Sequence, residues 1–302
     1  MNLAVKIGRL RLKNPVMVAS GTFGTEYAEL VNINSLGAIV MKTITLRPRS
    51  GNSPPRIVET ASGMLNSIGL ENKGLDDFIE NKIPSLTKVE VPLIASIAGN
   101  DEKEFVQLAK RLTKIRRIAA LELNLSCPNI KYGARKELIA HDEKETYRIV
   151  KSVRNATGLT LIAKLSPNVT DITKIAKAAE DGGADSISLT NTFLGLAVDI
   201  EARKPRLGNI TGGLSGPAIK PLALRMVWEA HKKVSIPIIG IGGIMDYKDA
   251  IEFILCGASA IQIGMANFVN PKVSTEVIDG IKKYLTKNKI DNMNMVVGGL
   301  KS

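Results

Sequence analysis

Short runs of apolar, β-branched residues recur along the chain, and each is followed by a segment of helical length in which polar and apolar residues are mixed. Within each run the apolar residues are continuous rather than alternating, which is typical of strands buried on both faces. Eight runs show this pattern, and they cover residues 15–20, 38–43, 92–97, 118–125, 160–165, 185–190, 236–241 and 259–263. The pattern therefore predicts eight buried strands that alternate with helices.

The segments between these runs have the period of amphipathic helices. Asp101, Asp142 and Asp171 each stand where a carboxylate can cap the first turn. The predicted helices cover residues 26–34, 75–81, 101–114, 142–156, 171–181, 217–233, 247–255 and 273–285.

Eight β–α units in series favour a closed (β/α)8 TIM barrel over a doubly wound open sheet. No G-x-G-x-x-G follows the first strand and no Walker pattern is present, so neither nucleotide-binding fingerprint supports the open sheet. Residues 5–12 alternate around Gly8 and predict a small N-terminal β-hairpin below the barrel. We see no linker, and we expect one domain over residues 1–302.

The composition narrows the class of protein. Apolar residues make up 44% of the chain, but no apolar run approaches the roughly 18 residues of a membrane span. Residues 1–6 lack the pattern of a secretory signal, so we expect a cytoplasmic protein without a membrane partner. Two cysteines, no CxxC pair and no histidine cluster predict neither a disulfide framework nor a metal site.

The formal net charge of +12 allows two interpretations. A basic chain is one mark of nucleic-acid binding. The basic residues are spread along the whole sequence, however, with no basic tail and few aromatic residues between them. We therefore favour solvated helix faces together with a site for anionic ligands, and we expect no nucleic-acid partner.

Catalytic groups in such a barrel come from the carboxyl ends of the strands. Cys127 follows the fourth run directly, is held by Pro128, and lies between Asn124 and Asn129 in the sequence. A proline at this point ends the strand and presents the thiol on a loop. The alternative is a thiol that only packs, as many cysteines do.

Other strand ends carry groups suited to an anionic, planar ligand. Paired glycine turns at Gly242-Gly243 and Gly264-Met265 follow the last two strands, where backbone N–H groups can converge on a phosphate, although ordinary tight turns also use glycine. Lys42 and Lys164 end apolar strands and can hold an anion, unless they extend outwards. Asn66, Asn124 and Asn191 suit a hydrogen-bonding ring such as a pyrimidine, although asparagines in loops are often turn formers.

Five motifs together resemble class 1 dihydroorotate dehydrogenases, and the resemblance runs from about Gly21 to Ala266. The motifs are Asn66-Ser-Ile-Gly-Leu70, Asn124-Leu-Ser-Cys127-Pro-Asn129, Lys164-Leu-Ser-Pro-Asn168, Asn191-Thr192 and Gly212-Gly-Leu-Ser-Gly216-Pro-Ala-Ile-Lys-Pro221. The resemblance implies FMN-dependent oxidation of dihydroorotate to orotate in pyrimidine (UMP) synthesis, with Cys127 as the general base that takes the C5 proton while hydride passes from C6 to the flavin.

The resemblance also implies roles for individual residues. The substrate would be bound by Lys42, Asn66, Ser67, Ile68, Gly69, Leu70, Asn124, Asn191 and Thr192. FMN would be bound by Ser20, Lys42, Thr43, Ser96, Asn124, Lys164, Thr190, Gly216, Gly242, Gly243, Gly264 and Met265. Ser96 stands where an amide is expected, and Met265 stands where a small hydroxyl residue is common, so its contact would come from its backbone N–H.

The segments Ser166-Pro-Asn-Val-Thr-Asp171 and Phe23-Gly-Thr-Glu-Tyr27 are most similar to the class 1B catalytic subunit. That class implies a homodimer and a second subunit that carries FAD and an iron–sulfur cluster and passes electrons to NAD, although some chains of this type use another acceptor. Two cysteines are too few for such a cluster on this chain. The polar, glycine-containing segment 130–140 is a candidate lid over the site.

Two other readings compete with this one. A tRNA dihydrouridine synthase also resembles an FMN barrel with a Cys-Pro after strand four, but only about 20 residues remain after the helix of strand eight for an RNA-binding domain. A phosphate-binding barrel without catalysis would leave Cys127 and the two strand-end lysines without a role.

Overall fold

The computed structural model describes residues 1–24, 27, 29–126 and 139–301. Cys127, most of the candidate lid over 130–140, and part of the motif over 23–27 lie outside these described residues.

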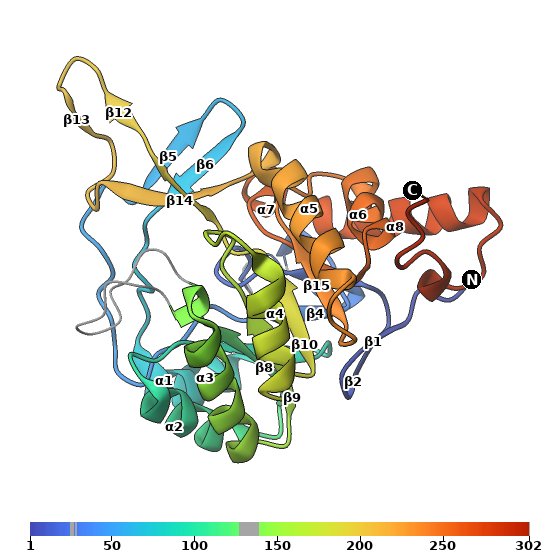
Figure 1. Cartoon of the computed structure of the whole chain (residues 1–302), viewed down its shortest axis with the longest axis horizontal. Helices are drawn as coiled ribbons and strands as arrows, with labels where there is room; N and C mark the ends of the chain where they lie inside the picture. Colours follow the sequence, from blue (N-terminus) through green and yellow to red (C-terminus); the bar gives the residue numbers. More distant parts are fainter. Residues whose placement is uncertain (25–26, 28, 127–138, 302) are drawn as a thin grey trace.

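Eight parallel strands close into a barrel in the order in which they follow one another along the chain (Figure 1). They are β3 (Val16–Val18), β4 (Ala38–Val40), β7 (Leu93–Ile97), β8 (Ile118–Asn124), β9 (Thr160–Lys164), β10 (Ser186–Leu189), β15 (Ile238–Ile241) and β16 (Ala258–Ile263). Each of the eight predicted runs contains one of these strands or overlaps with it, so the prediction of a (β/α)8 barrel is confirmed. Most residues of these strands are buried, as expected of strands covered by helices on one face and by the barrel interior on the other.

The helices surround the barrel, and most of them begin close to the residues at which the sequence predicted a helix start. They are α1 (Gly74–Asp77), α2 (Glu102–Thr113), α3 (Glu143–Ala156), α4 (Ile172–Asp181), α5 (Lys220–His231), α6 (Tyr247–Leu255), α7 (Ala266–Val269) and α8 (Val273–Lys287). The side chains of Asp101, Asp142 and Asp171 accept hydrogen bonds from backbone N–H groups in the first turns of α2, α3 and α4. These carboxylates also lie at the positive ends of the helix dipoles, which strengthens the caps.

One predicted helix is wrong. The segment 26–34 contains no α-helix among its described residues: Tyr27 and Glu29 have 3-10 conformation, and the 3-10 turn η2 (Ile33–Ser35) follows them. The side chain of Asn32 accepts from the backbone N–H of Asn34 and starts that turn. Asparagine side chains compete in this way with helical backbone hydrogen bonds.

Two antiparallel features join the barrel. The predicted N-terminal hairpin is confirmed as β1 (Val5–Ile7) and β2 (Leu10–Leu12), with Gly8 at a φ of 56° in its turn. A four-stranded sheet, which the sequence reading did not predict, has the order β11-β14-β6-β5. Its strands are β5 (Ile57–Thr60), β6 (Gly63–Asn66), β11 (Phe193–Leu196) and β14 (Thr211–Ser215), and β12 (Val198–Asp199) pairs with β13 (Lys204–Pro205) beyond it.

This four-stranded sheet joins two insertions that are distant in sequence. β5 and β6 come from the connection after β4, whereas β11 and β14 come from the connection after β10. Figure 1 shows it to one side of the barrel, with the β12–β13 hairpin extending outwards from it. The sheet therefore brings Asn66, at the end of β6, towards the ends of the barrel strands.

None of the helices in the described part of the chain has the length and apolar composition that a membrane-spanning helix needs.

Candidate functional site

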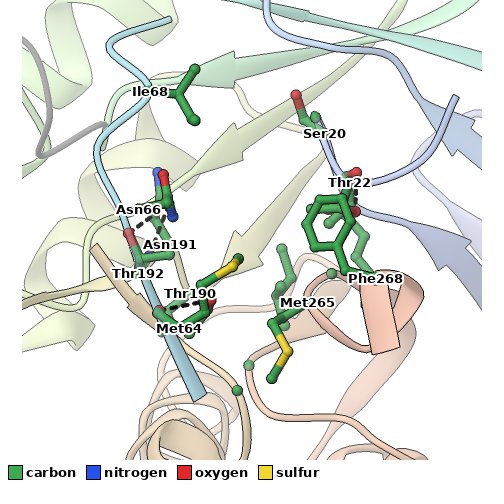
Figure 2. Close-up of a pocket in the computed structure, with 18 of the residues that line it drawn as sticks. Ser20, Thr22, Met64, Asn66, Ile68, Thr190, Asn191, Thr192, Met265 and Phe268 are labelled. Atoms are coloured by element: carbon green, nitrogen blue, oxygen red, sulfur yellow. Dashed lines mark hydrogen bonds between the residues drawn. The ribbon is translucent and has the colours of Figure 1, made fainter. Parts of the chain in front are cut away.

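A cavity of about 370 Å³ opens at the carboxyl ends of the barrel strands. Loops after β3, β4, β10, β15 and β16 contribute to its wall, as do the last residues of β8 and β9. In Figure 2, Asn66, Asn191 and Thr192 lie together on one side of the cavity, and Ser20, Thr22 and Phe268 lie on the other. This is the end of a (β/α)8 barrel at which active sites are found.

Most of the residues singled out in the sequence line this one cavity. They are Ser20, Lys42, Thr43, Asn66, Ile68, Gly69, Leu70, Asn124, Lys164, Thr190, Asn191, Thr192, Gly216, Gly242, Gly243, Gly264 and Met265. Ser67 and Ser96 are fully or almost fully buried and do not line it. Cys127 lies outside the described residues, and its predicted role stays a prediction.

A chain of hydroxyl groups connects three strand ends beneath the cavity. The Thr43 hydroxyl lies 3.1 Å from Ser20 Oγ and 2.8 Å from Ser96 Oγ. Asn124 Nδ2 donates to the same Thr43 oxygen over 3.3 Å. Ser96 therefore supports Thr43 from behind.

Asn191 is bound to the residue that precedes Cys127 in the sequence. Its Nδ2 donates to Ser126 Oγ over 3.0 Å, to the Ser126 carbonyl over 3.2 Å and to Asn124 Oδ1 over 3.4 Å. Its Oδ1 accepts from the backbone N–H of Thr192 over 2.8 Å. These bonds hold the Asn191 amide in one orientation and tie the end of β10 to the end of β8.

The segment 66–70 reaches the cavity through the four-stranded sheet. Asn66 pairs with Gly213 of β14, and its Nδ2 donates to the Gly213 carbonyl over 3.4 Å. Beyond it the chain turns through Gly69 and Leu70, both with positive φ, at 77° and 56°. A Cβ on Gly69 would lie 2.6 Å from the backbone nitrogen of Asn52, so only glycine fits this approach.

Glycines form a tight cradle where the turns after β14 and β15 meet. Gly216, Gly242 and Gly243 have positive φ values of 103°, 136° and 72°. A Cβ on Gly243 would lie 2.8 Å from both the Gly216 carbonyl oxygen and Lys220 Cβ. The turn after β15 runs into α6, whose first turn is capped by Asp246. Backbone N–H groups at such a turn and the adjacent helix N-terminus suit a phosphate group.

Two lysines add positive charge to the cavity. Lys164 is 7% exposed, whereas Lys42 is exposed, and both line the wall. The ion pairs found in the described part of the chain include neither lysine. A buried ammonium group without a carboxylate partner favours an anionic ligand.

Comparisons with known proteins agree with this geometry. The family model for dihydroorotate dehydrogenase matches residues 2–285. The chain belongs to the dihydroorotate dehydrogenase family. It is 54% identical over 300 residues to "Dihydroorotate dehydrogenase B (NAD(+)), catalytic subunit" of Desulforamulus reducens, which covers 99% of this chain and 98% of that protein. It is 52% identical to a protein of the same name from Thermoanaerobacter sp. (strain X514), over 100% of this chain and 99% of that one.

Membership of the dihydroorotate dehydrogenase family confirms the resemblance stated from the five motifs, including its class 1B form, and with it the prediction of an oxidoreductase. It also favours this interpretation over the tRNA dihydrouridine synthase considered above. A Bacteroides thetaiotaomicron protein with the same name is 50% identical over 99% of both chains.

Several residues that line the cavity were not predicted from the sequence. Met64, Ser215 and Phe268 line the wall from the four-stranded sheet and α7. Met64 and Ser215 pair across β6 and β14, a contact that no local pattern indicates. Gln262 also lines the cavity, and here a signal existed, because it is a polar residue within the apolar run of β16.

Proposed function

We propose that this chain oxidises dihydroorotate to orotate and uses FMN as its bound cofactor. The observation that carries the proposal is the single cavity that joins the glycine cradle, two lysines and three asparagine amides. The relatives named above, which match the chain over nearly its whole length, support the choice of substrate.

The residues of the cavity fit FMN. The cradle of Gly216, Gly242 and Gly243 leaves no room for side chains, and Gly264 faces open space, since a Cβ there would meet nothing closer than 3.7 Å. Thr190 Oγ1 is buried without a hydrogen-bond partner, which is costly unless a ligand supplies one. When bound, FMN supplies the acceptor for the hydride that leaves C6 of the substrate.

In the proposal the glycine cradle holds the phosphate of the cofactor, and Lys164 holds an anionic or electron-rich part of it. Ser20, Thr43 and Thr190 provide hydroxyls, Gly264 and Met265 provide backbone N–H groups, and Ser96 acts through Thr43. Lys42 is exposed at the cavity wall, and in this assignment it contacts both FMN and dihydroorotate.

The substrate ring is assigned to Asn66, Asn124, Asn191 and Thr192. Side-chain amides both donate and accept, which matches the alternating N–H and C=O groups of a pyrimidine ring. The loop 66–70 adds backbone groups, and Ser67 is buried behind it. Binding between fixed amides orients the ring, and orientation of this kind lowers the barrier to reaction.

Cys127 is proposed as the general base that removes the C5 proton. The assignment is supported by its place in the sequence, directly after Ser126, whose carbonyl and hydroxyl are bound by Asn191. A thiol has an ordinary pKa of roughly 8.5, and only the thiolate can accept the proton. The sulfur therefore ends the step protonated, and the proton is returned to solvent.

We further propose that electrons leave this chain for a second subunit with FAD and an iron–sulfur cluster, and then reach NAD. The names of the relatives contain the words "(NAD(+))" and "catalytic subunit", which supports both steps. A homodimer of this chain in the cytoplasm is part of the same proposal.

Reconstitution with FMN tests the assignment. The purified chain is expected to be yellow or to become yellow with FMN, and dihydroorotate is expected to bleach it without oxygen. Dihydrouracil, which lacks the carboxylate, is the matched control and should bleach it far more slowly. A chain that stays colourless with FMN, or a flavin that dihydroorotate does not reduce, would contradict the proposal.

A further inference from the structure

A polar cluster lies inside the barrel, where apolar side chains normally fill the interior. It consists of Glu122 on β8, Ser188 on β10 and Gln262 on β16, and all three are completely buried. These strands are the fourth, sixth and eighth of the barrel, and alternate strands contribute side chains to the same interior layer. Of the three residues, Gln262 lines the cavity.

The carboxylate of Glu122 determines how the Gln262 amide is turned. Gln262 Nε2 donates to Glu122 Oε2 over 2.7 Å, and Ser188 Oγ donates to the same oxygen over 3.1 Å. Because Gln262 Nε2 is the donor to this carboxyl oxygen, the amide directs its nitrogen towards Glu122. The amide oxygen of Gln262 is thereby directed away from the carboxylate.

This amide oxygen is buried and has no hydrogen-bond donor within the described protein. Burial of an acceptor without a donor is unfavourable, and Glu122 Oε1 is also buried without a donor among the described residues. Apolar residues of similar size would fill the layer without either cost. The cluster therefore has a purpose other than packing.

We propose that Gln262 is a further cofactor-contacting residue, whose Oε1 accepts a hydrogen bond from an N–H or O–H group of the bound flavin, and that Glu122 is the positioning residue that holds its amide. The proposal deepens the function proposed above, because it rests on flavin binding in this cavity. In this proposal the flavin supplies the hydrogen-bond donor that Gln262 Oε1 lacks. The proposal also explains why the Glu122 carboxylate is kept in the barrel interior.

Flavin affinity of the apoprotein tests the role of Gln262. Gln262→Met replaces the amide by an apolar side chain of similar length, and we expect the Kd for FMN, measured by quenching of flavin fluorescence, to rise about tenfold. Gln262→Asn, which is one methylene too short to reach both Glu122 and the ligand, should raise it similarly and serves if the first variant does not fold. Ser188→Ala is the matched control, because it removes a neighbour of the same carboxylate but leaves the amide in place.

Binding of three flavins that differ in their side chain identifies which flavin group donates to Gln262 Oε1. If the donor is a ring N–H, Gln262→Met weakens binding of lumiflavin, riboflavin and FMN alike. If it is a hydroxyl of the ribityl chain, lumiflavin binding is unchanged and the other two are weakened. Both outcomes support the proposal.

Glu122 variants distinguish positioning from packing. Glu122→Gln keeps an acceptor for Gln262 Nε2 and should bind FMN within a few-fold of the parent, whereas Glu122→Met should weaken binding about as much as Gln262→Met. The double variant should be no weaker than either single variant, since both remove the same contact. The proposal is overturned if both Gln262 variants bind FMN as tightly as the parent, or if Ser188→Ala loses as much FMN affinity as they do. A parent chain that binds no flavin would instead overturn the proposed function.

Discussion

The side-chain amide of Asn191 donates hydrogen bonds to both the carbonyl and the hydroxyl of Ser126, over 3.2 and 3.0 Å. Ser126 is the last described residue before Cys127, so the end of β10 holds the start of the segment that carries the proposed base. The same amide group lines the cavity. Asn191 thus has two tasks in the proposed reaction: binding the substrate ring and fixing the backbone next to the thiol.

Substitution of Asn191 should therefore impair both binding and chemistry. Asn191→Asp keeps an acceptor for the Thr192 N–H but cannot donate to Ser126, so it should lower kcat/KM for dihydroorotate about 10- to 100-fold, since these part-buried hydrogen bonds are lost. Orotate affinity, measured by its effect on the flavin spectrum, should fall as well. Asn81→Asp, at an exposed helical position, is the control. Equal activity of the Asn191 and Asn81 variants would exclude a role for the amide.

Removal of the Cys127 thiol should slow the chemical step while binding survives. General-base catalysis typically contributes about 10²–10⁴-fold, so Cys127→Ala should slow flavin reduction by dihydroorotate by that factor. Cys127→Ser should regain activity only at high pH, because a hydroxyl is a much weaker acid than a thiol. Stopped-flow reduction across pH measures both.

The second cysteine provides the control for this experiment. Cys256 follows α6 away from the cavity, and burial raises the pKa of its thiol, with a smaller contribution from Glu252. Cys256→Ala should therefore reduce its flavin as fast as the parent. A Cys127→Ala variant that does the same would show that the proton leaves to another group.

Strands, caps and strand-end residues were predictable because their signals are local. Continuous apolar runs marked all eight barrel strands, and Asp101, Asp142 and Asp171 marked the starts of three helices. Once the barrel was inferred, its topology alone placed Lys42 and Lys164 at the same end. The cavity that joins them follows from parallel strands having their carboxyl ends together.

The four-stranded sheet could not be predicted in the same way. Asn66 meets Gly213 across a separation of 147 residues, and the glycine-rich β14 has little intrinsic preference for a strand. The position of Ser96 behind Thr43 depends likewise on side-chain packing. Glu122 and Gln262 were visible as polar residues within apolar runs, but their pairing across the barrel required the structure.

Acid should destabilise the fold partly through Glu180 at the end of α4. Burial alone would raise the pKa of Glu180, but hydrogen bonds from Lys177 and Ser235 outweigh it and lower the pKa to about 2. The unfolded value is the ordinary 4.5, so the stabilisation is fully present above about pH 4.5 and is lost as the pH falls through 2.

Glu180→Gln should consequently lower the free energy of unfolding by about 2–3 kcal/mol at pH 7 and by much less at pH 3. Urea unfolding at the two pH values measures the difference. Glu80→Gln, at an exposed position, is the control and should leave the pH dependence unchanged. A constant difference between Glu180→Gln and the parent at both pH values would contradict the proposed linkage.

A side chain at Gly243 should expel the cofactor. The residue has a φ of 72°, which β-branched residues rarely adopt, and a Cβ there would lie 2.8 Å from the Gly216 carbonyl oxygen. Gly243→Val should therefore open the cradle, cost about 1–3 kcal/mol of stability and weaken FMN binding strongly. Gly158→Val is the matched control, because a Cβ at Gly158 would meet nothing within 4 Å. Titration of both apoproteins with FMN, alongside urea unfolding, separates loss of binding from loss of fold. The phosphate assignment fails if folded Gly243→Val binds FMN as tightly as the Gly158 variant, since a distorted cradle could not then be what holds the phosphate.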